Sequence, residues 1–355
     1  MKKPSFCTIL LVVAMFLASA LSAVAAPHYT CKKLGSLGGT GSPESRAEAI
    51  NADGMVVGSA ITSSGDSHAF LYIGGVMQDL ATLPTPYNVS SEASGINAVG
   101  QVVGTSYSSI PYHAFLWGGG VMQDLGTFPG GVSWSQAFGI NGAGQVVGWA
   151  YNSSGDQHAF LYSGGVMKDL GALSTSSSAY GINDAGQVVG RSGHAFLYSS
   201  GGGMQDLGTL PGGGDSWANA INASAQVVGG AWTSSGPHAF LYSSSTGMQD
   251  LGTLGGVSSE AFGINTTGQV VGKAATLMDT AAFLYIDGVM YNLNSLVTNQ
   301  PKGVNMYLYE AYGINDRGQI IAHGIAARGT DIDYNGAYLL TPTTAVSALD
   351  LLLLD

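Results

Sequence analysis

Residues 139–148 and 158–171 read GINGAGQVVG and HAFLYSGGVMKDLG, and close copies of both stretches recur along the whole chain. Each repeat contains four phrases: A-x-G-I-N, G-Q-V-V-G, H-A-F-L-Y and M-x-D-L-G. The asparagine of the first phrase occurs seven times, at intervals of 39 to 50 residues: Asn51, Asn97, Asn141, Asn183, Asn222, Asn265 and Asn315. A repeat of about 44 residues holds four short strands and their turns, the unit of a β-propeller blade.

The residues between the phrases indicate hairpin turns. An N-x-x-G sequence joins the first two phrases, which suits a type I turn followed by a residue in the left-handed conformation. Six copies obey this pattern, and the fifth has Ala225 in place of glycine. Gly164-Gly165 and its equivalents predict a second hairpin between the third and fourth phrases. The strands are apolar without clean alternation, as in sheets that are covered on both faces.

The number of copies predicts how the repeats close. The first and third phrases occur seven times, if 281–285 and 336–340 are counted as divergent copies of HAFLY. The M-x-D-L-G phrase follows Asn51 only six times, and its missing copy resembles Lys33 to Gly39, KLGSLGG, near the N-terminus. An N-terminal strand that completes the last blade would leave no open edge. We therefore expect an all-β, seven-bladed propeller, and the alternative is an open β-solenoid.

The N-terminus is typical of an export signal. Lys2 and Lys3 precede an apolar run, and 23–25 read AVA, a cleavage site of the A-x-A type. We expect a signal peptide at 1–25, one propeller domain at 26–341 and a short tail at 342–355 that contains LDLLLLD. The protein is then exported, to the periplasm or the extracellular space, and the apolar run is too short to serve as a membrane span.

Composition excludes several kinds of partner. Without residues 1–25, the chain has 9 basic and 22 acidic residues, a formal charge of −13. This charge, without a basic cluster, argues against nucleic acid as a partner. Cys31 is then the one remaining cysteine, so no internal disulfide and no cysteine-based metal site is expected. We expect a monomer stabilised by a large apolar core.

These repeated phrases resemble those of the HAF-repeat extracellular proteins of bacteria. The resemblance rests on GINxxGQVVG, HAFLY and DLGTLGG, as at 139–148, 158–162 and 250–256, and it extends from about residue 31 to about residue 341. It implies a secreted bacterial protein with a propeller-like fold. It assigns no activity and no catalytic residue.

Histidines and aspartates recur together in five repeats. In a hairpin that turns at Gly164-Gly165, His158 lies diagonally across from Asp169, within reach of a hydrogen bond. An enzyme seldom needs five equivalent dyads, and five sites around a ring cannot share one metal ion. We therefore predict structural hydrogen bonds rather than catalysis or metal binding, in these pairs: His68 with Asp79, His113 with Asp124, His158 with Asp169, His194 with Asp206, and His238 with Asp250.

Loop lengths indicate which rim of the propeller carries function. The N-x-x-G turn is constant, whereas the loop before the histidine and the links between blades vary, and both lie on the same rim. We call this the variable rim. Flat indole rings beside amides and hydroxyls suit a sugar. The candidate ligand-binding residues are Trp134 and Trp217 in blade links, Trp149 and Trp232 at the second loops, and Asn152, Asp156 and Asp215 beside them. The alternative is that the tryptophans fill gaps between blades.

Two further features belong to this rim. Asp331, Asp333 and Asn335 resemble the first half of a calcium-binding loop, but Pro342 stands where the twelfth position needs glutamate. An isolated turn is the alternative to a Ca²⁺ site, and no other cofactor is expected.

Glu92, Glu260 and Glu310 directly precede the predicted inner strands and are the acid candidates if the protein cleaves polysaccharide.

The sequence therefore predicts a secreted, non-enzymatic scaffold that binds a glycan or an extracellular protein through the variable rim. The alternative is a propeller hydrolase or lyase that acts on polysaccharide. No recognisable spacing of nucleophile and base favours that alternative.

Overall fold

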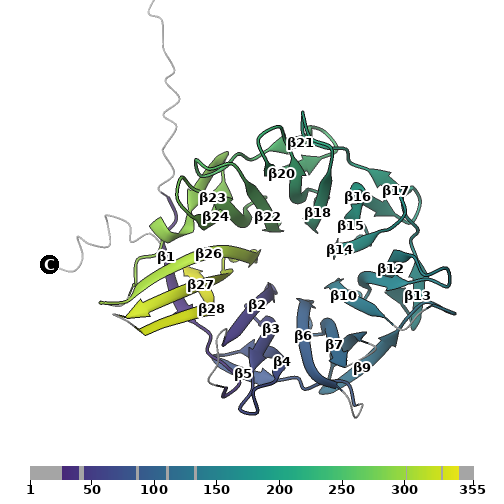
Figure 1. Ribbon diagram of the computed structural model, residues 1–355, viewed down its shortest axis with the longest axis horizontal. Coiled ribbons are helices and arrows are strands. Elements are labelled where there is room, and N and C mark those ends of the chain that lie inside the picture. Colours follow the sequence, from purple (N-terminus) through teal and green to yellow (C-terminus); the bar gives the residue numbers. More distant parts are fainter. Residues whose placement is uncertain are drawn as a thin grey trace, which may run out of the picture.

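Seven antiparallel sheets of four strands each surround a common axis, as expected for a seven-bladed propeller (Figure 1). The computed structural model describes residues 26–39, 44–84, 88–108, 112–131, 134–300, 302–328 and 331–343. Each blade has its first strand nearest the axis and its last strand at the periphery (Figure 1). In the described part of the chain, no helix is both long and apolar enough to span a membrane.

The strands follow one another outward in each blade. The first three blades comprise β2 (Ser45–Ile50), β3 (Val56–Ile61), β4 (Ser67–Ile73) and β5 (Val76–Asp79); β6 (Asn88–Ile96), β7 (Val102–Ser108), β8 (His113–Gly118) and β9 (Val121–Gly126); and β10 (Ser135–Ile140), β11 (Val146–Tyr151), β12 (Gln157–Ser163) and β13 (Val166–Asp169). The next three comprise β14 (Ser178–Ile182), β15 (Val188–Ser192), β16 (His194–Ser199) and β17 (Gly203–Asp206); β18 (Ser216–Ile221), β19 (Val227–Trp232), β20 (Pro237–Ser243) and β21 (Gly247–Asp250); and β22 (Ser259–Ile264), β23 (Val270–Ala275), β24 (Thr280–Ile286) and β25 (Val289–Asn292). The seventh comprises β26 (Asn305–Ile314), β27 (Ile320–Arg328), β28 (Asp331–Pro342) and β1 (Tyr29–Lys33), and a 3-10 turn at Leu293–Ser295 precedes it.

The seventh blade confirms the predicted closure and excludes an open solenoid. Strand β1 pairs antiparallel with β28, with Tyr29 opposite Pro342 and Lys33 opposite Tyr338. The KLGSLGG phrase begins where this strand ends. Only Leu34 of the following residues continues the pairing, because its amide donates to the carbonyl of Ala337 at 2.9 Å. Lys33 lies opposite Tyr338 as Asp169 lies opposite Phe160 in blade three, so the N-terminal segment takes the position of the missing fourth phrase, as predicted.

The long insertion of blade seven is strand rather than loop. Residues 305–310, which the sequence places between the sixth M-x-D-L-G phrase and the last A-x-G-I-N phrase, lie in β26. Residues 331–336, which resemble the start of a calcium-binding loop, lie in β28 opposite β27. The extra residues continue the backbone ladder because the two neighbouring strands lengthen together. This blade accordingly extends beyond the others in Figure 1.

Every inner strand contains a β-bulge at the same repeat position. The pairing shifts by one residue at Ala47/Ala49 in blade one and at Ala137/Gly139 in blade three, and equivalent shifts occur in the other five blades. A bulge leaves one residue outside the ladder and redirects its side chain. The glycine of V-V-G permits this close pairing: a Cβ on Gly148 would lie 1.8 Å from the carbonyl oxygen of Gln136.

The repeated asparagine connects each blade to the next. Its side-chain oxygen accepts amide hydrogen bonds within its own turn, while its Nδ2 donates to the backbone carbonyl of the following asparagine at 3.0 to 3.3 Å. Seven such bonds run from Asn51 through Asn97, Asn141, Asn183, Asn222, Asn265 and Asn315, and the last returns to Asn51. We call this closed circle the asparagine ring, and all seven residues are buried.

The N-x-x-G turn holds its fourth residue in the left-handed conformation. Gly144 has φ 74° and Gly186 has φ 73°, and Ala225, the exception noted in the sequence, has φ 57°. A left-handed conformation costs a residue with a Cβ about 1–2 kcal/mol. Ala225 adopts the conformation because the surrounding blade imposes it.

Replacing Ala225 with glycine is therefore expected to stabilise the protein. The relief of strain exceeds the extra entropy of unfolded glycine, for a net gain of about 0.5–1 kcal/mol. Gly186→Ala is the matched control and should lower stability by about 1 kcal/mol. Urea unfolding of the two variants measures both effects, and a loss of stability in Ala225→Gly would contradict this account of the turn.

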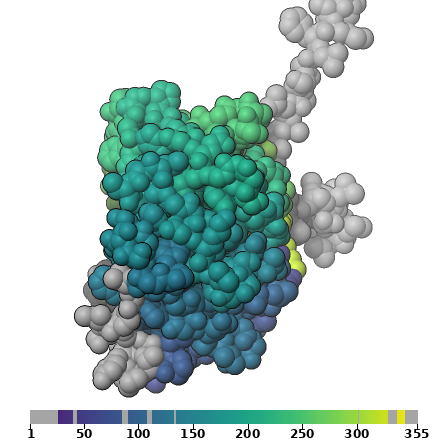
Figure 2. Space-filling model, turned by 90° about the vertical axis from the view of Figure 1, so that its right-hand side faces the viewer, coloured from purple at the N-terminus to yellow at the C-terminus, as the bar shows by residue number. Residues whose placement is uncertain are grey.

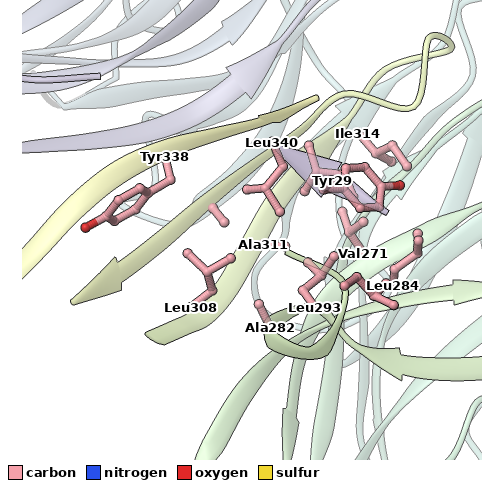
Figure 3. Packing of buried hydrophobic residues seen from close by; sticks show 13 residues of the cluster. Tyr29, Val271, Ala282, Leu284, Leu293, Leu308, Ala311, Ile314, Tyr338 and Leu340 are labelled. Atoms are coloured by element: carbon pink, nitrogen blue, oxygen red, sulfur yellow. The ribbon is translucent and has the colours of Figure 1, made fainter. Parts of the chain in front are cut away.

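The hydrophobic core lies between blades rather than within one. The phenylalanine of H-A-F is fully buried in each copy that carries it, and each core cluster combines residues of adjacent blades. At the closure, Tyr29 packs with Leu293, Leu308 and Leu340 (Figure 3). Seen from the side, successive blades form a continuous wall in which the colour changes gradually (Figure 2).

Candidate functional site

The seven bulged residues converge on the axis of the propeller. Together with four polar neighbours they line a cavity of about 290 Å³, which we call the channel mouth. The bulged residues are Glu48, Ser94, Phe138, Tyr180, Asn219, Phe262 and Tyr312, and the neighbours are Glu92, Thr105, Tyr107 and Gln136. The inner strands start at the variable rim, so the channel mouth lies toward that rim. A second cavity of about 260 Å³, next to the asparagine ring, forms the opposite end of the channel.

The channel mouth contains an unusual carboxyl group, Glu48. Protein surrounds it closely, although water still reaches it along the channel. Burial, assisted by the negative charges of Glu92 and Glu310 and opposed by Arg46, raises the pKa of Glu48 to about 8. Glu48 has no hydrogen bond or ion pair to any of the described residues. Its carboxyl is therefore protonated at neutral pH, and the residue lines the open cavity.

The other glutamates of this region lie within the inner strands and do not precede them, contrary to the expectation from sequence. Glu92 accepts a hydrogen bond from Tyr107 at 3.3 Å in the channel mouth. Glu310 accepts from Tyr312 and pairs with Lys273 at 3.1 Å, and Lys273 also lies 3.7 Å from Glu260. Glu260 and Glu310 are thus neutralised in part, whereas Glu92 contacts no cation among the described residues.

Two of the candidate tryptophans belong to one aromatic cluster on the variable rim. Tyr112 stacks on Trp134 with ring centroids 6.1 Å apart and meets Trp149 edge-on at 6.2 Å. Tyr151 contacts both tryptophans at 5.6 to 5.7 Å. Tyr107 lies 5.8 Å from Tyr112 and also lines the channel mouth, so the aromatic surface continues from the rim into the channel.

The other two candidate tryptophans, Trp217 and Trp232, lie outside this aromatic cluster. Trp217 lies in β18 rather than in a blade link, and its Nε1 donates to Glu260 at 2.6 Å. Arg191 covers its ring at 6.0 Å and forms an ion pair with Asp215 at 2.5 Å. These polar groups are therefore already paired with one another. Trp232 ends β19 with 46% of its surface exposed and makes no ring contact within the described residues.

Asn152 and Asp156 lie in the turn between β11 and β12. The Asn152 side-chain oxygen accepts the amides of Ser154 and Asp156 at 2.9 Å each, which defines the turn. Asp156 is exposed. Both residues follow Tyr151 closely in the chain, so they lie beside the aromatic cluster. Trp134, Trp149, Asn152 and Asp156 therefore share one region, and Trp217 with Asp215 occupies another.

The five histidine–aspartate pairs are hydrogen-bonded at the outer part of the blades. Nδ1 lies 2.7 to 2.9 Å from the nearer carboxylate oxygen in all five. The other carboxylate oxygen of Asp169 accepts the amide of Gly171, whose φ of 74° favours glycine, although Ala81 adopts a φ of 63° at the equivalent position of blade one. Desolvation opposes ionisation of Asp124, but hydrogen bonds from His113 and Gly126 outweigh it and lower the pKa of this carboxyl.

A serine at the start of the following blade connects the H-A-F and D-L-G phrases of one blade to the next blade. The amide of Ala159 donates to Ser177 Oγ at 2.8 Å, and this hydroxyl donates to the carbonyl of Gly171. Equivalent bonds occur at four more blade junctions. The repeated H-A-F and D-L-G phrases thus encode a contact between neighbouring blades.

His158→Ala is expected to lower stability by about 1 kcal/mol. The expected effect is small because the Asp169 side chain is 39% exposed and stays hydrated when its partner is removed. Thermal melting of His158→Ala beside Asp169→Asn measures the effect. A variant that fails to fold would show that the pair carries more than a local hydrogen bond.

The calcium candidate lies outside the described side chains. The backbone of 331–335 belongs to β28, which corrects the expected turn, but the side chains of Asp331, Asp333 and Asn335 are not described. Among the described residues, no group of three or more His, Cys, Asp or Glu side chains is arranged to hold a metal ion.

Of the residues that line the channel mouth, only Glu92 was a candidate from the sequence. Glu48, Phe138, Tyr180 and Tyr312 share a repeat position, yet their types differ from blade to blade. The available signal was this contrast: one position varies among the blades, inside an A-x-G-I-N phrase in which only the glycine is otherwise replaced, by Ala49 and Ala220. Such variation on a constant scaffold is typical of a binding surface.

Comparison with known proteins shows the fold alone. No family model matches the chain, and no curated protein sequence matches it. The extracellular domain of a protein described as a one-component system from B. thetaiotaomicron is similar at 12% identity and a TM-score of 0.52, over 90% of this chain and 40% of that one. A puromycin-hydrolysing peptidase from Mycobacterium tuberculosis is similar at 10% identity and a TM-score of 0.51, over 87% of this chain and 56% of that one. The chain thus spans about half the length of these two proteins.

Proposed function

We propose that the protein is an exported binding scaffold that holds a glycan on its variable rim. The observation that carries this proposal is the aromatic cluster of Tyr107, Tyr112, Trp134, Trp149 and Tyr151, which runs from the rim into the channel mouth. Aromatic faces pack on the apolar face of a sugar, and adjacent amides and hydroxyls bind its hydroxyl groups.

Polar groups of the required kind flank the cluster. Gln136 pairs with Trp149 across two neighbouring strands and also lines the channel mouth, and Asn152 and Asp156 follow Tyr151. Trp134 is 37% exposed, so a ligand can reach its ring. Export and membership of the HAF-repeat extracellular proteins are part of the same proposal, supported by the N-terminal segment and by the repeated phrases.

A glycan array and insoluble-polysaccharide pull-downs test the proposal. Trp134→Ala should weaken binding about tenfold or more, equivalent to about 1.4 kcal/mol. Trp232→Ala is the matched control, because this ring is exposed on the same rim but lies outside the cluster. Equal retention of the two variants, or an exclusively protein ligand, would contradict the glycan proposal.

A second candidate is cleavage of polysaccharide. The observation that favours it is the raised pKa of Glu48, with a second carboxyl, Glu92, in the same cavity, since glycoside hydrolysis uses a general acid with a raised pKa and a partner carboxyl. Measurement of reducing ends and unsaturated products distinguishes this candidate. Product that disappears in Glu48→Gln would support an enzyme, and absence of product with substrates that bind would support the scaffold.

A further inference from the structure

The channel mouth combines negative charge with aromatic rings. Four carboxyls lie in or beside it, those of Glu48, Glu92, Glu260 and Glu310, and the basic groups that act on them are Arg46 and Lys273. Lys273 is engaged by Glu260 and Glu310, and Arg46 is exposed. Even with Glu48 protonated, the three remaining carboxylates outnumber the two basic side chains. The electrostatic potential of the channel mouth therefore favours a cation.

The rings provide a second, independent preference for a cation. Phe262 is stacked on Tyr312 at 4.8 Å and has Lys273 over it at 5.2 Å, so its ring already binds an ammonium group. Phe138 and Tyr180 meet at 5.3 Å in the same cavity and carry no basic side chain among the described residues. A cation over such a face gains about 0.5–2 kcal/mol.

Glu48 is the group that this arrangement leaves without a partner. It lies on β2, lines the cavity and forms no hydrogen bond or ion pair with the described residues. The charged and titratable groups around it are Arg46 on its own strand, Glu92 on β6, Glu310 and Tyr312 on β26, and His323 on β27. Burial lowers the pKa of His323 to about 4, so this histidine is neutral and does not neutralise Glu48.

We propose that the channel mouth binds an organic ammonium group between Glu48, Glu92 and the rings of Phe138 and Tyr180. The site goes beyond glycan binding on the rim and does not depend on it. Ammonium groups occur both in small organic cations and in amino sugars, and the experiment separates these sources. A cavity of about 290 Å³ accommodates one such group with a small substituent.

Binding of a cation must be linked to the ionisation of Glu48. A cation in the channel mouth favours the carboxylate, so binding releases a proton when the solution lies below the pKa of the empty site, about 8. The affinity of a permanently charged ligand should rise as the pH rises toward that value and level off above it.

Isothermal titration with tetramethylammonium chloride at constant ionic strength tests the site. We expect binding about tenfold tighter at about pH 9 than at about pH 6, with proton release that shows as a dependence of the heat on buffer ionisation. Glu48→Gln should match the wild type at the lower pH and lose the increase. Glu92→Gln should weaken binding at both pH values.

The control is Asp184→Asn, which removes an acid at the opposite end of the same channel. It should bind as the wild type does, because its carboxylate lies next to the asparagine ring. Equal losses in Asp184→Asn and Glu92→Gln would overturn the site, as would undetectable binding by folded wild-type protein or an affinity that does not change with pH.

Two sugars identify the source of the ammonium group. Glucosamine at about pH 6 is protonated, whereas N-acetylglucosamine carries no charge. Tighter binding of glucosamine, reversed by Glu92→Gln but not by Trp134→Ala, would support an amino sugar in the channel mouth. Binding of tetramethylammonium without this preference would support a small cation. Equal binding of both sugars, with none of tetramethylammonium, would contradict the proposal and leave the rim proposal intact.

Discussion

Tyr29→Ala is expected to lower the free energy of unfolding by about 3–5 kcal/mol, because the variant leaves a cavity at the closure of the ring. Tyr29 is 2% exposed and packs in one cluster with Leu293, Leu308 and Leu340 (Figure 3). For a domain of this size, the melting temperature should fall by about 4–8 °C.

The neighbouring Thr30 provides the matched control. Its side chain is exposed, and its hydroxyl makes a single contact with the carbonyl of Thr341 at 3.3 Å. Thr30→Ala should change stability by less than about 0.5 kcal/mol. If the two variants melted together, the closing strand would contribute little to the stability of the fold.

Asn183→Ala should cost about 2–4 kcal/mol. Its Nδ2 donates to the carbonyl of Asn222 and to Gln187 Oε1, and its Oδ1 accepts the amide of Gln187. Removal of the side chain leaves these buried groups without partners. Asn152→Ala is the control, since this side chain makes similar turn bonds but no hydrogen bond to another blade among the described residues, and about 1 kcal/mol is expected there.

Asn183→Asp tests the hydrogen bonds of the asparagine ring, because aspartate keeps the shape of asparagine but has an acceptor oxygen in place of the donor Nδ2. A carboxylate would face the oxygens of Asn222 and Gln187, so its pKa in the folded state should rise above the unfolded value of about 3.9. A raised pKa means that the folded state binds the proton more tightly, so the deficit relative to wild type grows as the pH rises. Urea unfolding at acidic and neutral pH measures the difference, and a constant deficit would contradict the hydrogen-bond assignment.

The repeat phrases predicted the architecture because each strand and turn depends on residues that lie close together in the chain, and the pattern occurs seven times. The glycine positions, the hairpin turns and the displaced copy at Lys33 can therefore be read directly from the sequence. The asparagine ring was missed because its Nδ2 bonds connect Asn183 to Asn222, a contact that requires blades already placed side by side. The turn role of the same residue was evident because its partner lies within four residues.

The candidate site was predicted only in part, and for a similar reason. Trp134 and Trp149 lie on the rim where loop lengths placed function. Trp217 belongs instead to an inner strand, where Glu260 and Arg191 hold it. The channel residues depend on a bulge, which exists only in the pairing of two strands, and the environment of Glu48 depends on three blades at once.

The most direct test of the account is a cross-link across the closure, because the channel and both rims exist only if the ring is closed. Thr30 and Thr341 are paired in register between β1 and β28, where antiparallel partners lie about 4.5–5.5 Å apart. With Cys31 replaced by serine, Thr30→Cys with Thr341→Cys should form a disulfide that peptide mapping under non-reducing conditions detects in nearly all molecules. Thr30→Cys with Ser154→Cys should form none. Absence of the first disulfide in folded monomer, or equal yields of the two, would contradict the closed seven-bladed ring.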